Sequence, residues 1–189
     1  MPPDNKPDAA PKTMAKSTRV SNPRPKRSLR GWLVNILVIL VIFFGVQWCK
    51  SRPLASGEAP ALSTATTMAQ PFDLTSLRGQ PTLVHFWAVW CPICKLEEDN
   101  IEALSSDYQV ITVAMQSGSD MEINTYLQGQ GLSFDAIADP YGEIATQWGV
   151  RGVPASFVLD GDGNIRFASV GYSTGVGLRG KLWAAAQLE

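Results

Sequence analysis

Two cysteines three residues apart, Cys91 and Cys94, stand where a buried-strand pattern gives way to a helix. Residues 83–89 are apolar and aromatic, which predicts a strand inside a sheet. Pro92 follows Cys91, and proline is favoured in the first turn of a helix. The sequence therefore predicts that Cys91 lies at a helix N-terminus directly after a buried strand.

This position predicts a chemical role for both cysteines. Unpaired backbone N–H groups and the helix dipole favour an anion at a helix N-terminus, so the Cys91 thiolate is stabilised and reactive. Cys94 lies on the same face of the helix, close enough to form a disulfide with Cys91. We expect Cys91 to attack a disulfide or thiol of a substrate, and Cys94 to resolve the mixed disulfide.

Other uses of a C-x-x-C pair fit this chain less well. A zinc site needs a second pair of ligands, whereas the chain has one further cysteine, Cys49, and a single histidine, His85. Covalent haem attachment requires histidine directly after the second cysteine, where this chain has Lys95. We expect no metal and no cofactor, although a structural disulfide and a copper site made by the two thiolates stay open.

Strand and helix patterns alternate through the last 120 residues. Strands are predicted over residues 109–114, 134–138, 155–159 and 165–170, with a hairpin signal, Asp-Gly-Asp-Gly-Asn, between the last two. Helices are predicted after Cys91 and over residues 120–128, 141–148 and 174–188. This alternation favours an α/β fold with a mixed sheet.

Two segments resemble the thioredoxin superfamily: residues 86–94 (FWAVWCPIC) and residues 149–157 (GVRGVPASF). The resemblance covers about residues 70–189 and implies a thioredoxin fold with a central mixed sheet and flanking helices. It also implies a cis Val153–Pro154 bond beside the cysteine pair. Trp90, Val153 and Pro154 would then line the groove that binds the client chain.

The order of segments is similar to that of the membrane-anchored bacterial thiol-disulfide oxidoreductases. These include the TlpA/ResA/DsbE type and the suppressor-of-copper-sensitivity D proteins. The resemblance implies client proteins with thiols or disulfides, and a membrane electron-transfer protein as redox donor. Ile93 supplies no charge to stabilise the thiolate, so we favour the reducing direction. A disulfide-introducing oxidase and a non-catalytic binding module remain alternatives.

Three further residues are candidates for proton transfer or tuning. His85 lies six residues before Cys91, where thioredoxin holds a buried Asp that moves protons for the second cysteine. A histidine has a pKa suited to that task, although a hydrogen-bonded core residue is the simpler interpretation. Glu97 and Glu98 follow Cys94, and the subgroup uses a glutamate there to tune the potential. The helical spacing instead predicts that both lie largely on an exposed acidic face.

The first seventy residues predict where the domain is held. Residues 1–30 are rich in Pro, Lys, Arg and Ser, which predicts a disordered basic tail. Residues 31–49 contain the apolar run 32–48, bracketed by Trp32 and Trp48, which predicts a single transmembrane helix. Residues 50–69 predict a linker, and residues 70–189 the thioredoxin-like domain.

Charge predicts the orientation in the membrane. Residues 1–52 carry ten Lys and Arg against two Asp, whereas residues 53–189 carry six against fifteen Asp and Glu. Basic residues directly before the apolar run place the N-terminus in the cytoplasm. We expect a single-pass protein of the bacterial inner membrane with its catalytic domain in the periplasm. With a membrane anchor next to the basic tail, we expect no nucleic-acid partner.

Overall fold

The computed structural model describes residues 29–51 and 54–188. The helix α1 spans Leu29–Ser51. The predicted tail, residues 1–30, lies outside the described residues except for the first two positions of this helix. Among the residues described, no helix combines the length and the hydropathy needed to cross a membrane.

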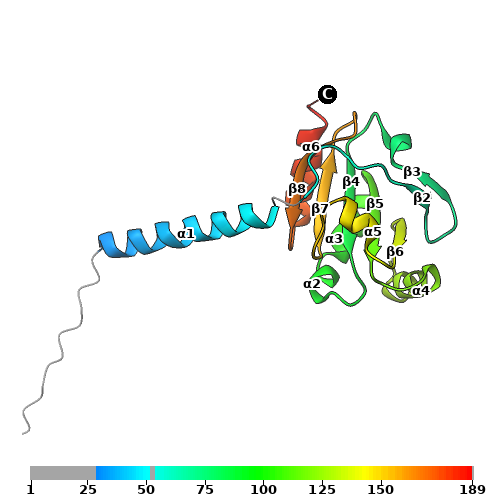
Figure 1. Ribbon diagram of the computed structural model, residues 1–189, viewed down its shortest axis with the longest axis horizontal. Helices are drawn as coiled ribbons and strands as arrows, with labels where there is room; N and C mark the ends of the chain where they lie inside the picture. Colours follow the sequence, from blue (N-terminus) through cyan, green and yellow to red (C-terminus); the bar gives the residue numbers. More distant parts are fainter. Residues whose placement is uncertain (1–28, 52–53, 189) are drawn as a thin grey trace, which may run out of the picture. The chain divides into compact units, whose positions relative to one another are not determined.

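Residues 54–188 form a mixed sheet with flanking helices, and Figure 1 shows the arrangement of its strands. The strand order is β1-β8-β7-β4-β5-β6. β4 pairs in parallel with β5, and β5 with β6, whereas β7, β8 and β1 join in antiparallel fashion. The strands of this sheet are β1 (Gly57–Glu58), β4 (Thr82–Trp87), β5 (Gln109–Met115), β6 (Ala136–Asp139), β7 (Ala155–Leu159) and β8 (Asn164–Val170).

A separate two-stranded ribbon precedes the first long strand. It consists of β2 (Ser63–Ala65) and β3 (Pro71–Asp73), and the short 3-10 helix η1 (Leu74–Leu77) follows it. The helices of the domain are α2 (Pro92–Lys95), α3 (Glu98–Ser105), α4 (Asp120–Gln130), α5 (Glu143–Gln147) and α6 (Gly175–Ala185). The predicted α/β fold with a central mixed sheet is confirmed.

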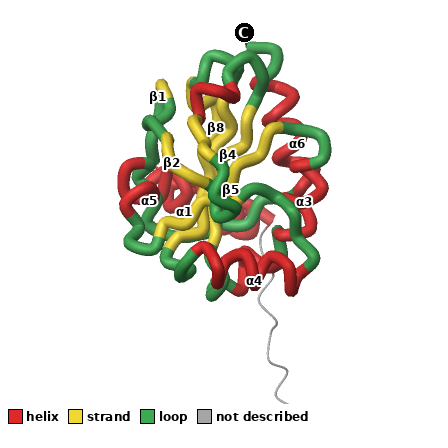
Figure 2. The backbone as a smooth tube through the Cα atoms, turned by 90° about the vertical axis from the view of Figure 1, so that its right-hand side faces the viewer, coloured by secondary structure: helices red, strands yellow, loops and turns green. Residues whose placement is uncertain are grey.

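The sheet separates two hydrophobic cores. Seen along the sheet in Figure 2, α3 and α6 cover one face and α5 covers the other. β4 shows the alternation that divides them: Leu83 and Trp87 pack with α3, α4 and α6, whereas Val84 and Phe86 pack with the α5 side. Every residue of this strand is buried because both faces are covered.

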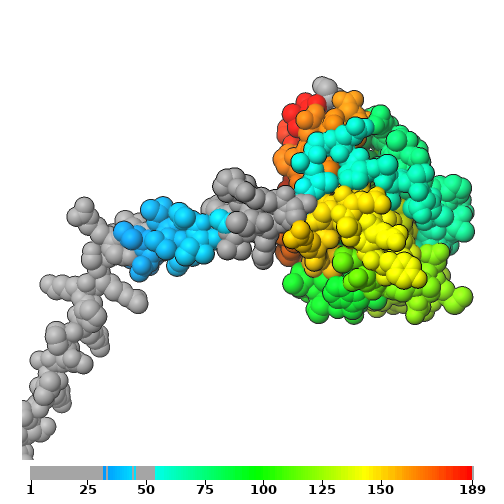
Figure 3. Space-filling view, viewed as in Figure 1, coloured from blue at the N-terminus to red at the C-terminus, as the bar shows by residue number. Residues whose placement is uncertain are grey.

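The folded domain begins earlier than the sequence predicts. The predicted linker, residues 50–69, contains β1, which pairs with β8, and β2, which pairs with β3 directly after the linker. Leu54 and Leu62 are buried in the α5-side core, and the Ala55 N–H donates to the carbonyl of Trp148. Figure 3 shows this N-terminal segment, in cyan, beside α5, in yellow. The linker prediction is wrong for these residues because isolated leucines in a polar stretch carry no periodic signal.

The helix after the cysteines is broken, which changes the face that each residue presents. α2 ends at Lys95 and α3 begins at Glu98, so Leu96 and Glu97 lie between two helices. Leu96 is 69% exposed, whereas Glu97 and Glu98 are buried. The prediction of an exposed acidic face is therefore wrong at both glutamates, because it assumed one continuous helix.

Candidate active site

Cys91 and Cys94 form a disulfide at the N-terminus of α2, and their Cα atoms are 5.3 Å apart. Cys91 is the N-cap residue of α2, and its Sγ accepts a hydrogen bond from the Cys94 backbone N–H at 3.2 Å. The same N–H stabilises a thiolate once the disulfide is opened. Cys91 is 4% exposed and Cys94 1%, so Cys91 is the sulfur that a partner reaches first.

The segment before β7 lies against this disulfide. The Val153–Pro154 peptide bond is cis, as the resemblance implies. The Val153 carbonyl oxygen is 3.7 Å from the Cys91 Sγ. β7 is antiparallel to β4, so its first residue meets the end of β4 at the same edge of the sheet. Sheet pairing thus brings Cys91 and Val153, 62 residues apart in the sequence, into contact.

Trp90 is held beside the cysteines by the loop after β5. Its indole Nε1–H donates to the Gln116 carbonyl oxygen at 3.0 Å, yet the side chain is 55% exposed. The Ser117 hydroxyl accepts from the Val89 N–H at 3.1 Å and donates to the Met115 carbonyl oxygen at 3.0 Å. The polar edge of the indole is therefore fixed while its apolar face stays open to a partner.

Two further exposed side chains belong to the segments that carry the cysteines and follow β8. Ile93, between the two cysteines, and Tyr172, in the loop after β8, are both about half exposed. The Gly171 N–H donates to the Pro154 carbonyl oxygen at 2.8 Å, which joins the Tyr172 loop to the cis-proline segment. Exposed aromatic and apolar side chains of this kind suit contact with a protein chain.

His85 and Glu97 face each other in the core below the cysteines. The His85 Nε2 is 3.8 Å from the Glu97 Oε2, and both side chains are almost fully buried. Burial lowers the pKa of His85 to about 4. Burial also raises the pKa of Glu97 to about 7, against the opposing effect of the Ser173 N–H, which donates to Glu97 Oε1. Near neutral pH the histidine is uncharged and the carboxyl group titrates.

Glu98 belongs to a different contact. Its Oε1 accepts a hydrogen bond from the Tyr126 hydroxyl at 2.6 Å, and Tyr126 packs against Trp87. Burial and the Glu98 hydrogen bond raise the pKa of Tyr126. The structure brings His85 and Glu97 together below the cysteines, and it turns Glu98 towards α4.

Several contacts of this site have only a weak signal in the sequence. The Ser156 Oγ lies 3.0 Å from the His85 Nδ1. Ser156 carries the one hydroxyl group in the otherwise apolar strand β7. A single polar residue in an apolar strand is a feature of the sequence by which Ser156 could have been singled out. The contacts of Gln116 and Ser173 are made by backbone atoms, so no side-chain pattern predicts them.

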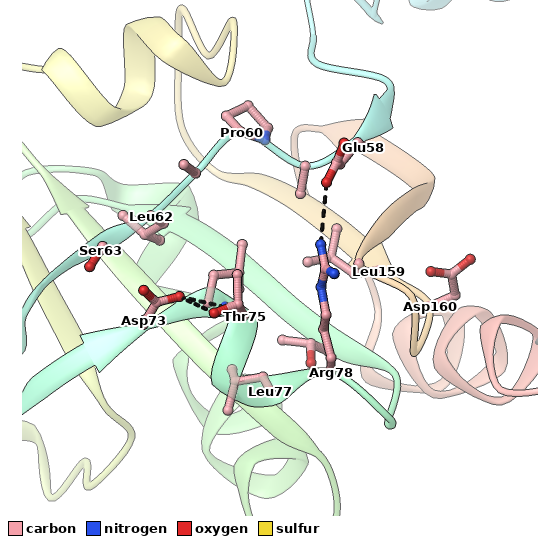
Figure 4. A pocket seen from close by; sticks show the side chains of 15 residues that line it. Glu58, Pro60, Leu62, Ser63, Asp73, Thr75, Leu77, Arg78, Leu159 and Asp160 are labelled. Carbon is pink, nitrogen blue, oxygen red and sulfur yellow. Dashed lines mark hydrogen bonds and ion pairs between the residues drawn. The ribbon is translucent and has the colours of Figure 1, made fainter.

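A hollow of the described domain lies away from the cysteines. Its volume is about 400 Å³, and its lining includes Thr82 at the start of β4. The cysteines come after the opposite end of this strand. Figure 4 shows two pairs among its polar groups: Arg78 donates to Glu58, and Asp73 accepts from Thr75. Within residues 29–51 and 54–188, no group of three or more His, Cys, Asp and Glu side chains is placed to hold a metal ion.

The similarities of this chain to known proteins agree with the geometry of the cysteine site. The AhpC/TSA family model matches residues 55–168. A thioredoxin-like protein of Haemophilus influenzae is 30% identical over 162 residues, which cover 85% of this chain and 96% of that protein. The thiol:disulfide interchange protein DsbE of Allochromatium vinosum is 29% identical over 157 residues, which cover 79% of this chain and 87% of the relative.

Solved structures share the fold. A thiol:disulfide interchange protein of the thioredoxin family from Chlorobium tepidum superposes with a TM-score of 0.61 at 24% identity, covering 69% of this chain and 97% of that one. StoA of Bacillus subtilis superposes with a TM-score of 0.57 at 23% identity, covering 64% and 95%. The chain therefore belongs to the AhpC/TSA family and has a thioredoxin-like fold.

Proposed function

We propose that this protein exchanges disulfides with client proteins through Cys91 and Cys94, and that it works in the reducing direction. The observation that carries the proposal is the position of Cys91 at the N-terminus of α2, with the Cys94 N–H on its sulfur and Val153 beside it. The curated relatives of this disulfide oxidoreductase include several thiol:disulfide interchange proteins, which supports the same chemistry.

The reaction proceeds in two exchanges. The Cys91 thiolate attacks a client disulfide, forms a mixed disulfide with one client sulfur and releases the other as a thiolate. Cys94 then loses its proton and attacks the Cys91 sulfur, which releases the second client thiolate and forms the Cys91–Cys94 disulfide. The client gains two electrons and the protein loses two. A membrane electron-transfer protein restores the dithiol by the reverse exchange.

Trp90, Val153 and Pro154 hold the client in this scheme. Val153 offers backbone groups next to Cys91, and Trp90 offers an exposed aromatic face whose N–H is already bound. An extended client segment laid along Val153 brings its sulfur to Cys91, the more accessible cysteine.

Glu97 and His85 serve Cys94 in this proposal. The Glu97 backbone N–H donates to the Cys94 carbonyl oxygen at 2.9 Å, so the carboxyl group starts one helical turn from the second cysteine. A carboxyl group with a pKa near 7 is suited to accept and return a proton at neutral pH. Glu98 has no part in this step because Tyr126 occupies its carboxylate.

The membrane anchor is a further part of the proposal, and it rests on the sequence. Residues 32–48 contain no charged side chain, and Arg24, Lys26, Arg27 and Arg30 precede them. An apolar run of about this length, preceded by basic residues, would hold the catalytic domain at the periplasmic face of a bacterial inner membrane.

Replacing the second cysteine should trap clients. In a Cys49→Ser background, the Cys94→Ser variant cannot resolve the mixed disulfide, so we expect covalent client adducts that dithiothreitol releases. Non-reducing electrophoresis and mass spectrometry measure them. The matched Cys91→Ser variant should form none. If Cys94→Ser binds clients without covalent adducts, the domain is a non-catalytic binding module.

The reduction potential of the Cys91–Cys94 pair decides the direction. A reductant should equilibrate with glutathione and dithiothreitol at a potential near or below about −200 mV, towards the range of thioredoxin. A potential near about −120 mV, like that of DsbA, would make the protein an oxidase and reverse the proposed electron flow.

The His85–Glu97 pair should make stability depend on pH in two opposite ways. Folded His85 stays neutral to about pH 4, whereas the unfolded side chain is protonated below 6.5, so its contribution rises with pH in that window. Folded Glu97 keeps a proton to about pH 7 that the unfolded chain releases near 4.5, so its contribution falls with pH.

Single replacements should separate these slopes. Urea unfolding of the oxidised Glu97→Gln variant should show stability rising from pH 4 to 6.5 more steeply than in the wild type. The His85→Gln variant should show stability falling from pH 4.5 to 7. Equal slopes in all three proteins would mean that neither pKa is shifted as the structure indicates.

Alkaline extraction tests the anchor. The full chain should remain in the membrane pellet at alkaline pH, because its apolar helix is held by the hydrocarbon core. A variant with Ile39→Asp and Ile42→Asp should move to the supernatant. Recovery of the unaltered chain in the supernatant would contradict the anchor.

A further inference from the structure

A row of polar side chains crosses the sheet on the face covered by α3 and α6. His85 of β4 lies directly opposite Ser156 of β7, and Ser156 lies directly opposite Ser169 of β8. Directly opposite residues point to the same face of a sheet. The neighbours of the two serines, including Phe157 and Ala168, pack in the core on the α5 side, which places the serines on the α3 and α6 side.

Hydrogen bonds extend this polar row at both ends. The Ser156 Oγ is 3.0 Å from the His85 Nδ1. The Lys181 Nζ, from α6, donates to the Ser169 Oγ at 3.3 Å. At the other end the His85 Nε2 faces the Glu97 Oε2 at 3.8 Å, and this oxygen is buried with no hydrogen-bond partner. The row thus runs from Lys181 to Glu97.

Burial changes along the row. Glu97, His85 and Ser156 are buried, whereas Ser169 and Lys181 are partly exposed. Buried polar groups weaken a core unless they are hydrogen-bonded, and β7 otherwise contributes only apolar residues here. The row therefore connects the buried carboxyl group below the cysteines with solvent at α6.

We propose that Ser156 and Ser169 form a proton relay between Lys181 at the surface of α6 and the buried His85–Glu97 pair. The proposal rests on the proposed function, since the proton that Cys94 exchanges is the one that the relay carries. Ser156 and Ser169 are positioning residues, because they act through His85 and touch neither the client nor the reacting sulfurs.

The donor pattern allows one proton to pass inward. Lys181 donates to Ser169, and with His85 protonated on Nε2 the Ser156 hydroxyl donates to His85 Nδ1. In the relay, Ser169 would donate to Ser156, and the His85 Nε2–H to the Glu97 carboxylate. If each proton moves one place, Lys181 becomes neutral, Glu97 becomes protonated, and His85 changes tautomer from Nε2–H to Nδ1–H. Water then returns a proton to Lys181. For the reverse shift, Lys181 first gives a proton to water; the Cys94 proton held by Glu97 is then passed on through His85 and the two serines, and Lys181 regains a proton.

Two gaps in the row are short enough for this shift. Opposite residues on paired strands have Cβ atoms about 4.5–5.5 Å apart, so one side-chain rotation or one water joins the hydroxyls of Ser156 and Ser169. The 3.8 Å between Glu97 and His85 closes by rotation of the carboxyl group, whose other oxygen accepts from the Ser173 N–H. Catalytic hydrogen bonds are often long in resting structures.

The charged groups around the row are few. Glu97, directly before α3, faces His85, and Lys181 of α6 faces Ser169. Cys94 lies within α2. Thr112 of β5, opposite His85, is uncharged, and its hydroxyl is occupied by Trp87 Nε1 and the Asp135 carbonyl oxygen. Burial lowers the pKa of Lys181, which eases the loss of its proton.

Oxidation of the reduced full chain by oxidised glutathione tests the relay. The first step forms the Cys91–glutathione mixed disulfide, and the second, in which Cys94 loses its proton, releases glutathione. At pH 6 the Glu97 carboxyl group is mostly protonated. It must release this proton to the relay before it can accept the proton of Cys94. We expect Ser156→Ala and Ser169→Ala to slow the second step about tenfold at pH 6, with little effect at pH 8.5.

Control variants separate the relay from a structural effect. Ser156→Thr keeps the hydroxyl and should stay within about twofold of the wild type. Thr82→Val removes a buried hydroxyl from the other end of β4 and should leave the pH profile unchanged. Ser169→Ala, at a partly exposed position, keeps the test valid if Ser156→Ala does not fold.

Two outcomes would overturn the relay. If the wild type reacts with glutathione and both alanine variants follow its pH profile, the relay is wrong and the proposed function stands. If the wild type forms no mixed disulfide with glutathione, the proposed function fails and the relay fails with it.

Discussion

The pairing of β4 between β5 and β7 is the constraint on which the site depends. β4 is parallel to β5 and antiparallel to β7, so the end of β4, the end of β5 and the start of β7 meet at one edge of the sheet. Cys91, the Gln116 loop and Val153 are brought together there from three distant parts of the chain. Cys91 contributes the sulfur, the Gln116 carbonyl oxygen holds the Trp90 indole, and Val153 places its backbone next to the disulfide.

The same pairing places polar groups beneath the disulfide, at a cost to the core. His85, Glu97 and Ser156 are buried where an apolar residue would stabilise the fold more. Burial moves the pKa values of His85 and Glu97 in opposite directions, so both groups can be neutral together in weakly acidic solution. A neutral pair is tolerated in the core, and it still offers one site that titrates near neutral pH.

Much of the fold could be predicted from local patterns. Residues 155–159 coincide with β7, and the strands predicted over 109–114 and 165–170 differ from β5 and β8 by one residue. The cysteine pair, Trp90 and the cis Val153–Pro154 bond could also be predicted, because short motifs specify them. Glu97 and Glu98 could not be placed, since the break between α2 and α3 depends on packing and leaves no helix-breaking residue in the sequence.

The sequence by itself determined the chemistry and the class of fold: two cysteines at a helix start, alternating strands and helices, and an apolar run near the N-terminus. These are local properties, because spacing and periodicity act over a few residues. Only the tertiary structure decided which polar groups share the core. Ser156, Ser169 and Lys181 align with His85 because strand register and the packing of α6 bring them there, and register depends on pairing between distant segments.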